Sequence, residues 1–152
     1  MYPEIRIAQA ADINQLGELL GDLFRQEADF SPDESLQRKG LSAIIGNPEL
    51  GIIFVLEESQ LIIGMVNLLF SISTALGGKV AILEDMIVRP EYRKKGYGSL
   101  LINQAIVFAK NNGFQRITLL TDQNNLAAQS FYESFGFAKS AMIPMRLLFS
   151  AD

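Results

Sequence analysis

Apolar residues recur along the first part of the chain at helical spacing. A short strand is predicted over Glu4–Ala8. After it, Leu16, Leu20 and Phe24 recur four positions apart, as they do on one face of an α-helix. The pattern therefore predicts an amphipathic first helix that continues through about Glu27.

A second helix is predicted from a start signal and a stop signal. In the run SPDE, Ser31 can cap the helix, Pro32 suits the first turn and Glu34 completes a capping box. The segment Gly46-Asn47-Pro48 then ends the helix, because glycine and proline both interrupt helical backbone.

Two strands follow, and their residues are mostly β-branched or otherwise apolar. They cover GIIFVLEE, residues 51–58, and LIIGMVNLLFSI, residues 61–72, with a hairpin turn near residues 58–60. A further turn is predicted at Gly77-Gly78.

The next segment has the strand–loop–helix pattern. Val80–Val88 reads as a strand, and a helix follows with Leu101, Ala105 and Phe108 on one face, ending near Gly113. A strand at this point and a helix after it predict a crossover to a parallel neighbour.

The last third of the chain predicts one more strand and one more helix before a final extended segment. The strand is RITLLTD, residues 116–122, and Asn124 or Asn125 can cap the helix, which stops at Gly136. The final segment covers about Phe137–Phe149. The order β-α-α-β-β-β-α-β-α-β predicts a mixed α/β sheet.

Length and composition favour one intracellular domain over residues 1–152. The chain has 49% hydrophobic and 20% charged residues, enough apolar material for one core. The N-terminus has no basic head before an apolar run, and the longest apolar stretch is short and interrupted by Asn67. We therefore expect a cytoplasmic protein with no membrane partner.

The absence of cysteine and histidine restricts the chemistry. It removes disulfides, thiolate metal sites and a cysteine nucleophile, together with the commonest metal ligand and general base. We expect no metal. Catalysis must use carboxylates, hydroxyls, tyrosine, lysine, backbone dipoles or water.

The charge of −4 is unevenly spread. Residues 1–35 carry eight acidic and two basic side chains, whereas a basic cluster forms at Arg89, Arg93, Lys94 and Lys95. This indicates either two sites of opposite charge or two solvated faces. Because basic residues are few and the net charge is negative, we expect no nucleic-acid partner.

The run RKKGYG, Arg93–Gly98, lies between a predicted strand and a predicted helix. Helix N-termini offer unpaired N–H groups and a positive dipole end, and glycines let a phosphate approach the backbone. The spacing R-x-x-G-x-G is neither a P-loop nor a dinucleotide fingerprint. The run indicates a pyrophosphate site or a glycine turn with surface bases.

The surrounding sequence resembles two motifs of the GNAT superfamily, the acyl-CoA-dependent N-acyltransferases. ILEDMIVRPEYRKKGYGSLL, residues 82–101, resembles motif A, and TDQNNLAAQSFYESFGF, residues 121–137, resembles motif B. Lys95 stands where glycine is common. The resemblance covers about residues 80–137 and is loose in the N-terminal half.

The resemblance implies a GNAT fold, in which a mostly antiparallel sheet has helices on both faces and two central parallel strands splay apart. It implies acetyl-CoA as co-substrate, with the pantetheine arm in the splay and its pyrophosphate on the loop. The implied donor-binding residues are Met86, Ile87, Val88, Arg93, Lys94, Lys95, Gly96, Tyr97, Gly98, Ser99, Asn125 and Tyr132.

Two carboxylates interrupt the strand before the loop. Because side chains alternate along a strand, Glu84 and Asp85 must point to opposite faces, and one of them should face the cleft. Glu84 matches a glutamate that GNAT members use as a base or to position water. The alternative is that both are structural, paired with arginine or backbone groups.

Tyr132 is the candidate acid. Phe131 and Phe135 form an i, i+4 core pair, so Tyr132 is rotated off the core face by about 100°. Its phenol, neutral at pH 7, can protonate a thiolate. The alternative is a packing tyrosine at the edge of the helix.

The sequence therefore predicts transfer of an acetyl group to an amine by direct attack in a ternary complex. Glu27, Asp29 and Asp85 are candidate substrate-binding residues for a small cationic amine. A peptide amine, an acyl-CoA sensor without turnover and an interaction domain remain as alternatives. A homodimer formed through Met142–Phe149 is also predicted.

Overall fold

The computed structural model describes residues 2–27 and 32–149. Its backbone divides into two compact units, residues 1–120 and residues 121–152. The first unit holds the whole sheet and three α-helices, and the second holds one α-helix. The prediction of one domain over residues 1–152 stays a prediction.

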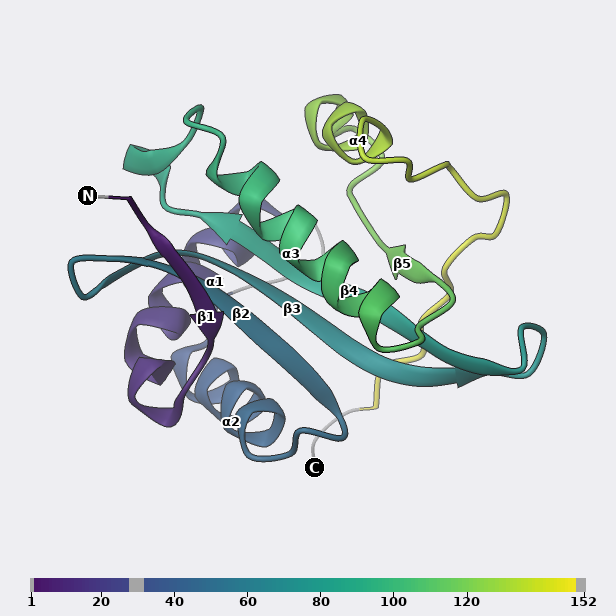
Figure 1. The fold of residues 1–152 in the computed structure, drawn as a ribbon, viewed down its shortest axis with the longest axis horizontal. Helices are drawn as coiled ribbons and strands as arrows, with labels where there is room; N and C mark the ends of the chain where they lie inside the picture. Colours follow the sequence, from purple (N-terminus) through teal and green to yellow (C-terminus); the bar gives the residue numbers. More distant parts are fainter. Residues whose placement is uncertain (1, 28–31, 150–152) are drawn as a thin grey trace. The chain divides into compact units, whose positions relative to one another are not determined.

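The first unit is built on a five-stranded sheet in the order β1-β2-β3-β4-β5. Neighbouring strands are antiparallel except for the parallel pair β4 and β5. This pair lies at one end of the described sheet (Figure 1). The strands are β1 (Glu4–Ile7), β2 (Gly51–Glu58), β3 (Leu61–Ser73), β4 (Gly78–Val88) and β5 (Ile117–Leu119).

Helices cover both faces of this sheet, as predicted. α1 (Ile13–Gln26) and α2 (Glu34–Ile45) lie on one face, and α3 (Tyr97–Asn111) lies on the other (Figure 1). Burial of a large aliphatic side chain stabilises a fold by about 1.5–3 kcal/mol. The core between the sheet and the first two helices contains Leu16, Leu19, Leu20, Leu41, Ile53, Val55, Met65 and Ile87.

α3 packs closely on the opposite face of the sheet. A Cβ on Gly64 of β3 would lie 2.9 Å from a methyl carbon of Leu101, so only glycine lets the helix approach this far. At the other end of α3, the ring of Phe108 stacks on Phe70 with centroids 5.9 Å apart. α3 is therefore held against β3 along its length.

Several predicted turns and boundaries are confirmed. Ser59 and Gln60 have positive φ in the hairpin between β2 and β3, and Gly77 has φ 73° in the next turn. α2 ends at Gly46. The cap of α2 differs from the prediction, because Asp33 accepts from the N–H of Leu36, the third residue of the helix, and the helix begins two positions later than predicted. Ser31 lies outside the described residues.

The second unit contains α4 (Leu126–Glu133) and an extended segment. Asn125 caps the helix, because its Oδ1 accepts from the N–H of Ala128 at 3.0 Å. The prediction of a final strand is wrong for the described residues, since 137–149 form no ladder. A strand needs a partner edge, which local propensity does not supply.

No helix within residues 2–27 and 32–149 is both long and apolar enough to cross a membrane.

Candidate functional site

The loop between β4 and α3 bends through left-handed backbone at two positions. Lys94 has φ 63°, and Gly96, which precedes α3, has φ 83°. Glycine adopts this conformation without penalty, whereas a side-chain-bearing residue loses about 1–2 kcal/mol. The loop therefore holds Lys94 in an unfavourable backbone conformation directly before the first turn of α3.

The first turn of α3 presents unpaired backbone donors. The opening N–H groups of a helix have no partner within it, and no side chain among the described residues caps them here. A Cβ built on Gly96 would meet no described atom within 4 Å, so open space lies in front of this backbone. The positive end of the helix dipole adds to the attraction for an anion.

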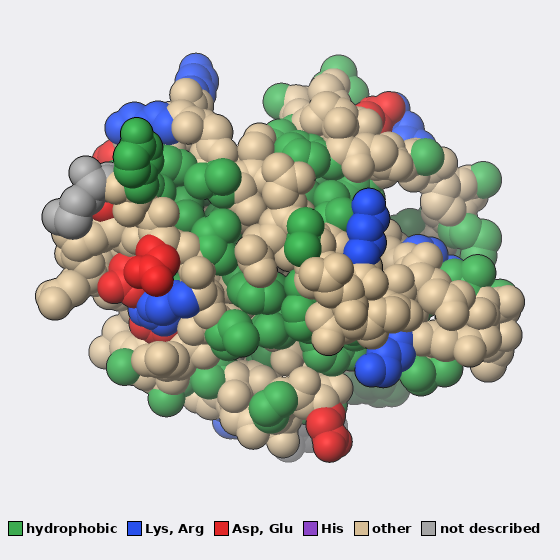
Figure 2. Space-filling view, in the orientation of Figure 1, with side chains coloured by type: hydrophobic (Ala, Val, Ile, Leu, Met, Phe, Trp, Pro, Cys, Tyr) green, Lys and Arg blue, Asp and Glu red, His purple; other side chains and the backbone are tan. Residues whose placement is uncertain are grey.

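The basic residues of this region make different contacts. Figure 2 shows Lys and Arg side chains projecting around the loop at the upper left. Lys95 lies 5.5 Å from the ring centre of Tyr92. Arg93 donates from Nε to the carbonyl of Val88 at 2.9 Å, which ties the loop to the end of β4.

Arg89 is structural, although it belongs to the same cluster in the sequence. Its Nε donates to the carbonyl of Ile62 at 2.6 Å, and its Nη2 lies 3.2 Å from Glu18 of α1. Only 14% of its side chain is exposed. The positive charge available to a ligand therefore comes from the loop itself.

β4 separates from β5 halfway along its length. Ala81–Leu83 pairs with Ile117–Leu119, and the pairing stops there. On that side Glu84–Val88 has no strand partner among the described residues. The parallel pair thus opens toward the end of β4 that leads to the loop, which is the splay that the resemblance implies.

The alternation of an antiparallel ladder decides which backbone groups face this opening. The N–H of Arg89 donates to the carbonyl of Ile63 at 2.8 Å, so Arg89 points toward β3. Two positions earlier, Ile87 must also direct its backbone groups to β3. Met86 and Val88 therefore direct theirs to the open side, where the carbonyl of Val88 already accepts from Arg93.

A β-bulge places the two candidate carboxylates in different environments. Leu68 faces Leu83 and Asn67 faces Asp85, so Glu84 is the extra residue. Glu84 is exposed, whereas Asp85 is half-buried. The regular alternation expected from sequence does not hold here, because the bulge interrupts it between the two residues.

Asp85 pairs with an amide and not with a cation. Asn67 donates from Nδ2 to Oδ2 of Asp85 at 3.0 Å. The pKa of Asp85 is raised to about 6, mainly by burial; the hydrogen bond from Asn67 lowers it in part, and the negative charge of Glu84 adds to the rise. A carboxyl with this pKa changes charge close to neutral pH.

Of the three predicted acceptor-binding acids, Glu27 and Asp85 belong to the described residues, and their role stays a prediction. Glu27 is half-buried just after α1, and Asp29 lies outside the described residues. Asp33 is used as the cap of α2, where it accepts from Leu36 at 3.1 Å.

Much of the remaining acidic excess is neutralised by arginine. Ion pairs between oppositely charged side chains offset the local field that a charge count suggests. These pairs are Asp12 with Arg6, Asp22 with Arg25, Glu34 with Arg38, and Glu18 with Arg89.

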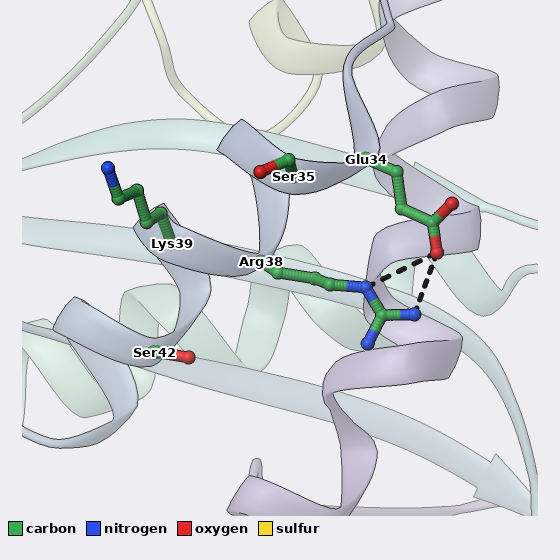
Figure 3. Close-up of a pocket in the computed structure, with 5 residues that line it drawn as sticks. All are labelled: Glu34, Ser35, Arg38, Lys39 and Ser42. Atoms are coloured by element: carbon green, nitrogen blue, oxygen red, sulfur yellow. Dashed lines mark hydrogen bonds and ion pairs between the residues drawn. The ribbon is translucent and has the colours of Figure 1, made fainter.

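A shallow depression lies along α2, lined by Glu34, Ser35, Arg38, Lys39 and Ser42 (Figure 3). Nη2 of Arg38 lies 2.7 Å from Oε1 of Glu34 across it. All five residues come from one helix, and none is a predicted site residue. The depression is a surface feature of α2. Elsewhere in the described chain, no three His, Cys, Asp or Glu side chains cluster as metal ligands would.

In the second unit, Tyr132 and Asn125 belong to α4 or its cap. The ring of Tyr132 contacts Phe137 with centroids 5.7 Å apart, and it meets Phe131 at 5.3 Å. Asn125 uses Oδ1 for the cap, which leaves its Nδ2 group as a donor.

Comparison with known proteins identifies the family. The family model of the acetyltransferase (GNAT) family matches residues 13–137, and the chain belongs to this family. An uncharacterized N-acetyltransferase of Bacillus subtilis, YhfO, is 31% identical over 134 residues, which cover 88% of this chain and 87% of that protein. The chain is thus an acyl-CoA-dependent N-acetyltransferase by family.

Two further similarities extend over nearly the whole chain. The glucosamine 6-phosphate N-acetyltransferase of Trypanosoma brucei brucei is 26% identical over 138 residues, 88% of each protein. The crystal structure of a possible acetyltransferase from Clostridium difficile 630 superposes with a TM-score of 0.85 at 19% identity, over 98% of this chain and 100% of that one. The latter supports the fold alone.

Sequence reasoning missed Asn67 as a partner of the site. A signal was present, because Asn67 is the one polar residue within the apolar run LIIGMVNLLF. Its partner, however, depends on the register between β3 and β4 and on the bulge, which the pattern of residues does not contain.

Proposed function

We propose that this protein transfers an acetyl group from acetyl-CoA to a primary amine, with a small cationic amine as acceptor. The observation that carries the proposal is the loop before α3, where unpaired donors and open space lie next to the free edge of β4. Family membership supports the class of reaction.

In this proposal the donor lies along two neighbouring stretches of backbone. The pyrophosphate is bound by the amides of Arg93–Ser99, with charge from Lys94 and Lys95. The pantetheine arm pairs with the free edge of β4, where alternation makes Met86 and Val88 the available residues beside Ile87. The Nδ2 group of Asn125 is proposed to donate a hydrogen bond to the same pantetheine arm.

The chemistry is direct attack of the amine on the thioester. The chain has no cysteine, so a route through an acetyl-cysteine is excluded. Holding both substrates together can lower the barrier by about 7–11 kcal/mol. Tyr132 protonates the departing thiolate, and one of the two carboxylates of β4 takes the proton of the amine. The resemblance favours Glu84 for this step.

The acceptor is proposed to be a small molecule. The name of the Trypanosoma relative specifies a sugar amine as its acceptor, and that relative matches 88% of this chain. Glu27 and Asp29 are the proposed contacts for a cationic group, and Asp85 lies on β4 beside the splay. The many acidic residues already paired with arginine reduce the expected field, so we expect only weak attraction of cations at a distance.

A pair of glycine variants tests the donor site. Gly96→Asp should abolish the rise in melting temperature caused by acetyl-CoA, because it places a negative charge in the anion cradle. Gly113→Asp is the matched control: Gly113 also has positive φ, 77°, and open space at its Cβ, but it follows the other end of α3. An unchanged response in Gly96→Asp would place the pyrophosphate elsewhere.

Turnover is tested separately by release of CoA in the presence of a panel of amines. Release that depends on the amine supports the transferase. Binding without such release would identify a sensor. A peptide amine as the preferred acceptor would contradict the small-molecule proposal.

We also propose a homodimer formed through Met142–Phe149 and a cytoplasmic location. Six large apolar side chains of that segment are at least 80% exposed: Met142, Ile143, Met145, Leu147, Leu148 and Phe149. Sedimentation at micromolar concentration would show a monomer if this proposal is wrong.

A further inference from the structure

One carbonyl on the free edge of β4 already accepts a hydrogen bond from a side chain of the loop that follows the strand. Nε of Arg93 donates to the carbonyl oxygen of Val88 at 2.9 Å. Residues of an antiparallel strand alternate in direction, and the N–H of Arg89 donates to the carbonyl of Ile63 on β3. Val88 therefore faces away from β3, on the side where Glu84–Val88 has no strand partner among the described residues.

The guanidinium stands where a ligand paired with this edge would place its own donor. A strand or an extended amide that adds to a sheet edge brings an N–H nitrogen to about 2.9–3.0 Å from a free carbonyl oxygen. Nε of Arg93 lies at this distance from the carbonyl of Val88. An added amide and this guanidinium therefore compete for one position at the end of β4.

The rest of the guanidinium is open to an anion. Arg93 is exposed and forms no ion pair in the described part of the chain. Its bond to Val88 uses one of the five N–H donors of an arginine side chain. Arg89 differs, because it is bound to both Ile62 and Glu18. Arg93 is thus held by one exposed hydrogen bond, whereas Arg89 is fixed.

Arg93 is also the first residue of the loop that binds the pyrophosphate in the proposed function. It stands three positions before Gly96, whose backbone leads into α3. Arginine binds a phosphate through two parallel N–H groups at once, whereas the carbonyl of Val88 engages only one. A phosphate that arrives at the loop therefore competes favourably for the guanidinium.

We propose that Arg93 is a specificity-determining residue, which keeps the free edge of β4 closed to thioesters that lack a pyrophosphate. A pyrophosphate bound at the loop draws the guanidinium away from Val88, and the released carbonyl then accepts the amide N–H of the pantetheine arm. This inference rests on the proposed function, because it assumes that acetyl-CoA lies along β4 and the loop. It adds a reason why coenzyme A, and not a shorter acyl-pantetheine, is the donor.

A purely structural bond predicts a different behaviour. If Arg93 served only to tie the loop to β4, its loss would weaken the binding of both halves of the donor. In the exchange described above, its loss weakens the binding of the anionic half and strengthens the binding of the pantetheine half. The two halves of the donor therefore distinguish the two roles.

The test uses these halves as separate probes, adenosine diphosphate and S-acetylpantetheine. Dissociation constants follow from the dependence of the melting temperature on ligand concentration. Arg93→Met removes the hydrogen bond and the charge but keeps much of the length of the side chain. It should bind S-acetylpantetheine about two- to tenfold more tightly than the wild type, which is the net contribution of one hydrogen bond. It should bind adenosine diphosphate about tenfold more weakly, because a charge-assisted contact is lost.

Lys94→Met is the matched control. Lys94 has the same charge at the next position of the loop, but the free carbonyl of Val88 is bonded by Arg93. The control should therefore bind adenosine diphosphate more weakly and should keep the wild-type affinity for S-acetylpantetheine. Circular dichroism of both variants checks that they are folded.

Coupling between the two halves gives a second readout. In the wild type, saturating adenosine diphosphate should raise the affinity for S-acetylpantetheine about two- to tenfold, because it draws Arg93 away from the carbonyl. By linkage, S-acetylpantetheine should raise the affinity for adenosine diphosphate by the same factor. Arg93→Met should show no coupling, and Lys94→Met should keep it.

The outcomes separate this inference from the proposed function. Binding of S-acetylpantetheine to Arg93→Met that is unchanged, weaker or undetectable overturns the inference, and so does a wild type without coupling. If acetyl-CoA still raises the melting temperature of the wild type, the inference fails alone. If acetyl-CoA causes no rise, the proposed donor site fails with it.

Discussion

Asp12 and Asp85 are two carboxylates of the same unit that are withdrawn from water but meet different partners. Asp12, 7% exposed, accepts from Arg6 at 2.8 and 2.9 Å and from the N–H of Gln9 at 2.7 Å. Asp85 accepts a hydrogen bond from the side-chain amide of Asn67, and it forms no ion pair within residues 2–27 and 32–149. The hydrogen bonds of Arg6 hold the pKa of Asp12 below its ordinary value, whereas burial raises that of Asp85.

The difference separates a structural carboxylate from one suited to proton transfer. Arg6 also donates to Glu57 of β2 at 2.6 Å, so the Asp12 cluster joins β1, its sheet neighbour and the start of α1. A carboxylate bound to a cation in this way stays ionised over the whole working range of pH. Asp85 lacks such a partner and can change its charge near neutrality, which is a property of functional sites.

The largest expected effect concerns protonation of the departing thiolate. A carboxylate that accepts the proton of the amine does not supply this proton, so the thiolate needs a separate donor, and Tyr132 is the candidate. Tyr132→Phe should lower kcat by about 10²–10⁴-fold and leave acetyl-CoA affinity nearly unchanged, because the phenol matters when thiolate charge develops. Steady-state kinetics with calorimetry measure both quantities. A variant that keeps more than half of its kcat would show that the phenol only packs.

Whether a region can be predicted from the sequence depends on how far apart along the chain its interacting residues lie. The loop Arg93–Gly98 was predictable, because a strand, two glycines and a helix start are local features. The hairpin turn at Ser59–Gln60 and the stop of α2 at Gly46 are also local, and both were predicted.

Features that depend on distant partners were not predictable. Arg89 was expected to belong to a basic patch, but it binds a carbonyl 27 positions away. Asn67 meets Asp85 through a bulge whose position follows from the pairing of whole strands. The cap of α2 shows a third cause: Ser31 and Asp33 are both good capping residues close together, and the sequence alone does not rank them.

The second-largest expected effect is the loss of stability when Asp12, the structural carboxylate, is replaced by a neutral residue. Asp12→Asn should lower the free energy of unfolding by about 2–3 kcal/mol at pH 7, since it leaves a partly buried arginine without its main partner. The pKa of Asp12 is lowered in the folded state, so its contribution is present above pH 4 and disappears as the pH falls below that.

Urea denaturation at pH 7 and at acid pH measures this change. The acetylation rate should be the same as in the wild type within about threefold, because surface and structural substitutions away from a site act on stability. A variant with normal stability but a large loss of rate would reverse the roles assigned to Asp12 and Asp85.

The smallest expected effect is a gain in stability when the charge of Asp85 is removed. The pKa of Asp85 is raised from 3.8 to about 6 on folding, so the charged form opposes folding. Stability from the protonated form is fully present below pH 3.8 and is lost as the pH rises through about 6. The full difference corresponds to about 3 kcal/mol, which partial exposure of the side chain reduces to about 1–2 kcal/mol.

Asp85→Asn should therefore raise the melting temperature by several degrees at pH 7.5 and should have almost no effect at pH 4, because the amide resembles the protonated acid. Glu84→Gln is the matched control. Its side chain is exposed on the same strand, so it should change the melting temperature only slightly.

Calorimetry at the two pH values measures the melting temperatures of the wild type and both variants. A stabilised Asp85→Asn that has lost its activity would show that the site keeps an unfavourable charge for the sake of the reaction, as enzymes often do. Equal or lower stability at pH 7.5 would instead mean that Asp85, like Asp12, serves to hold the fold together.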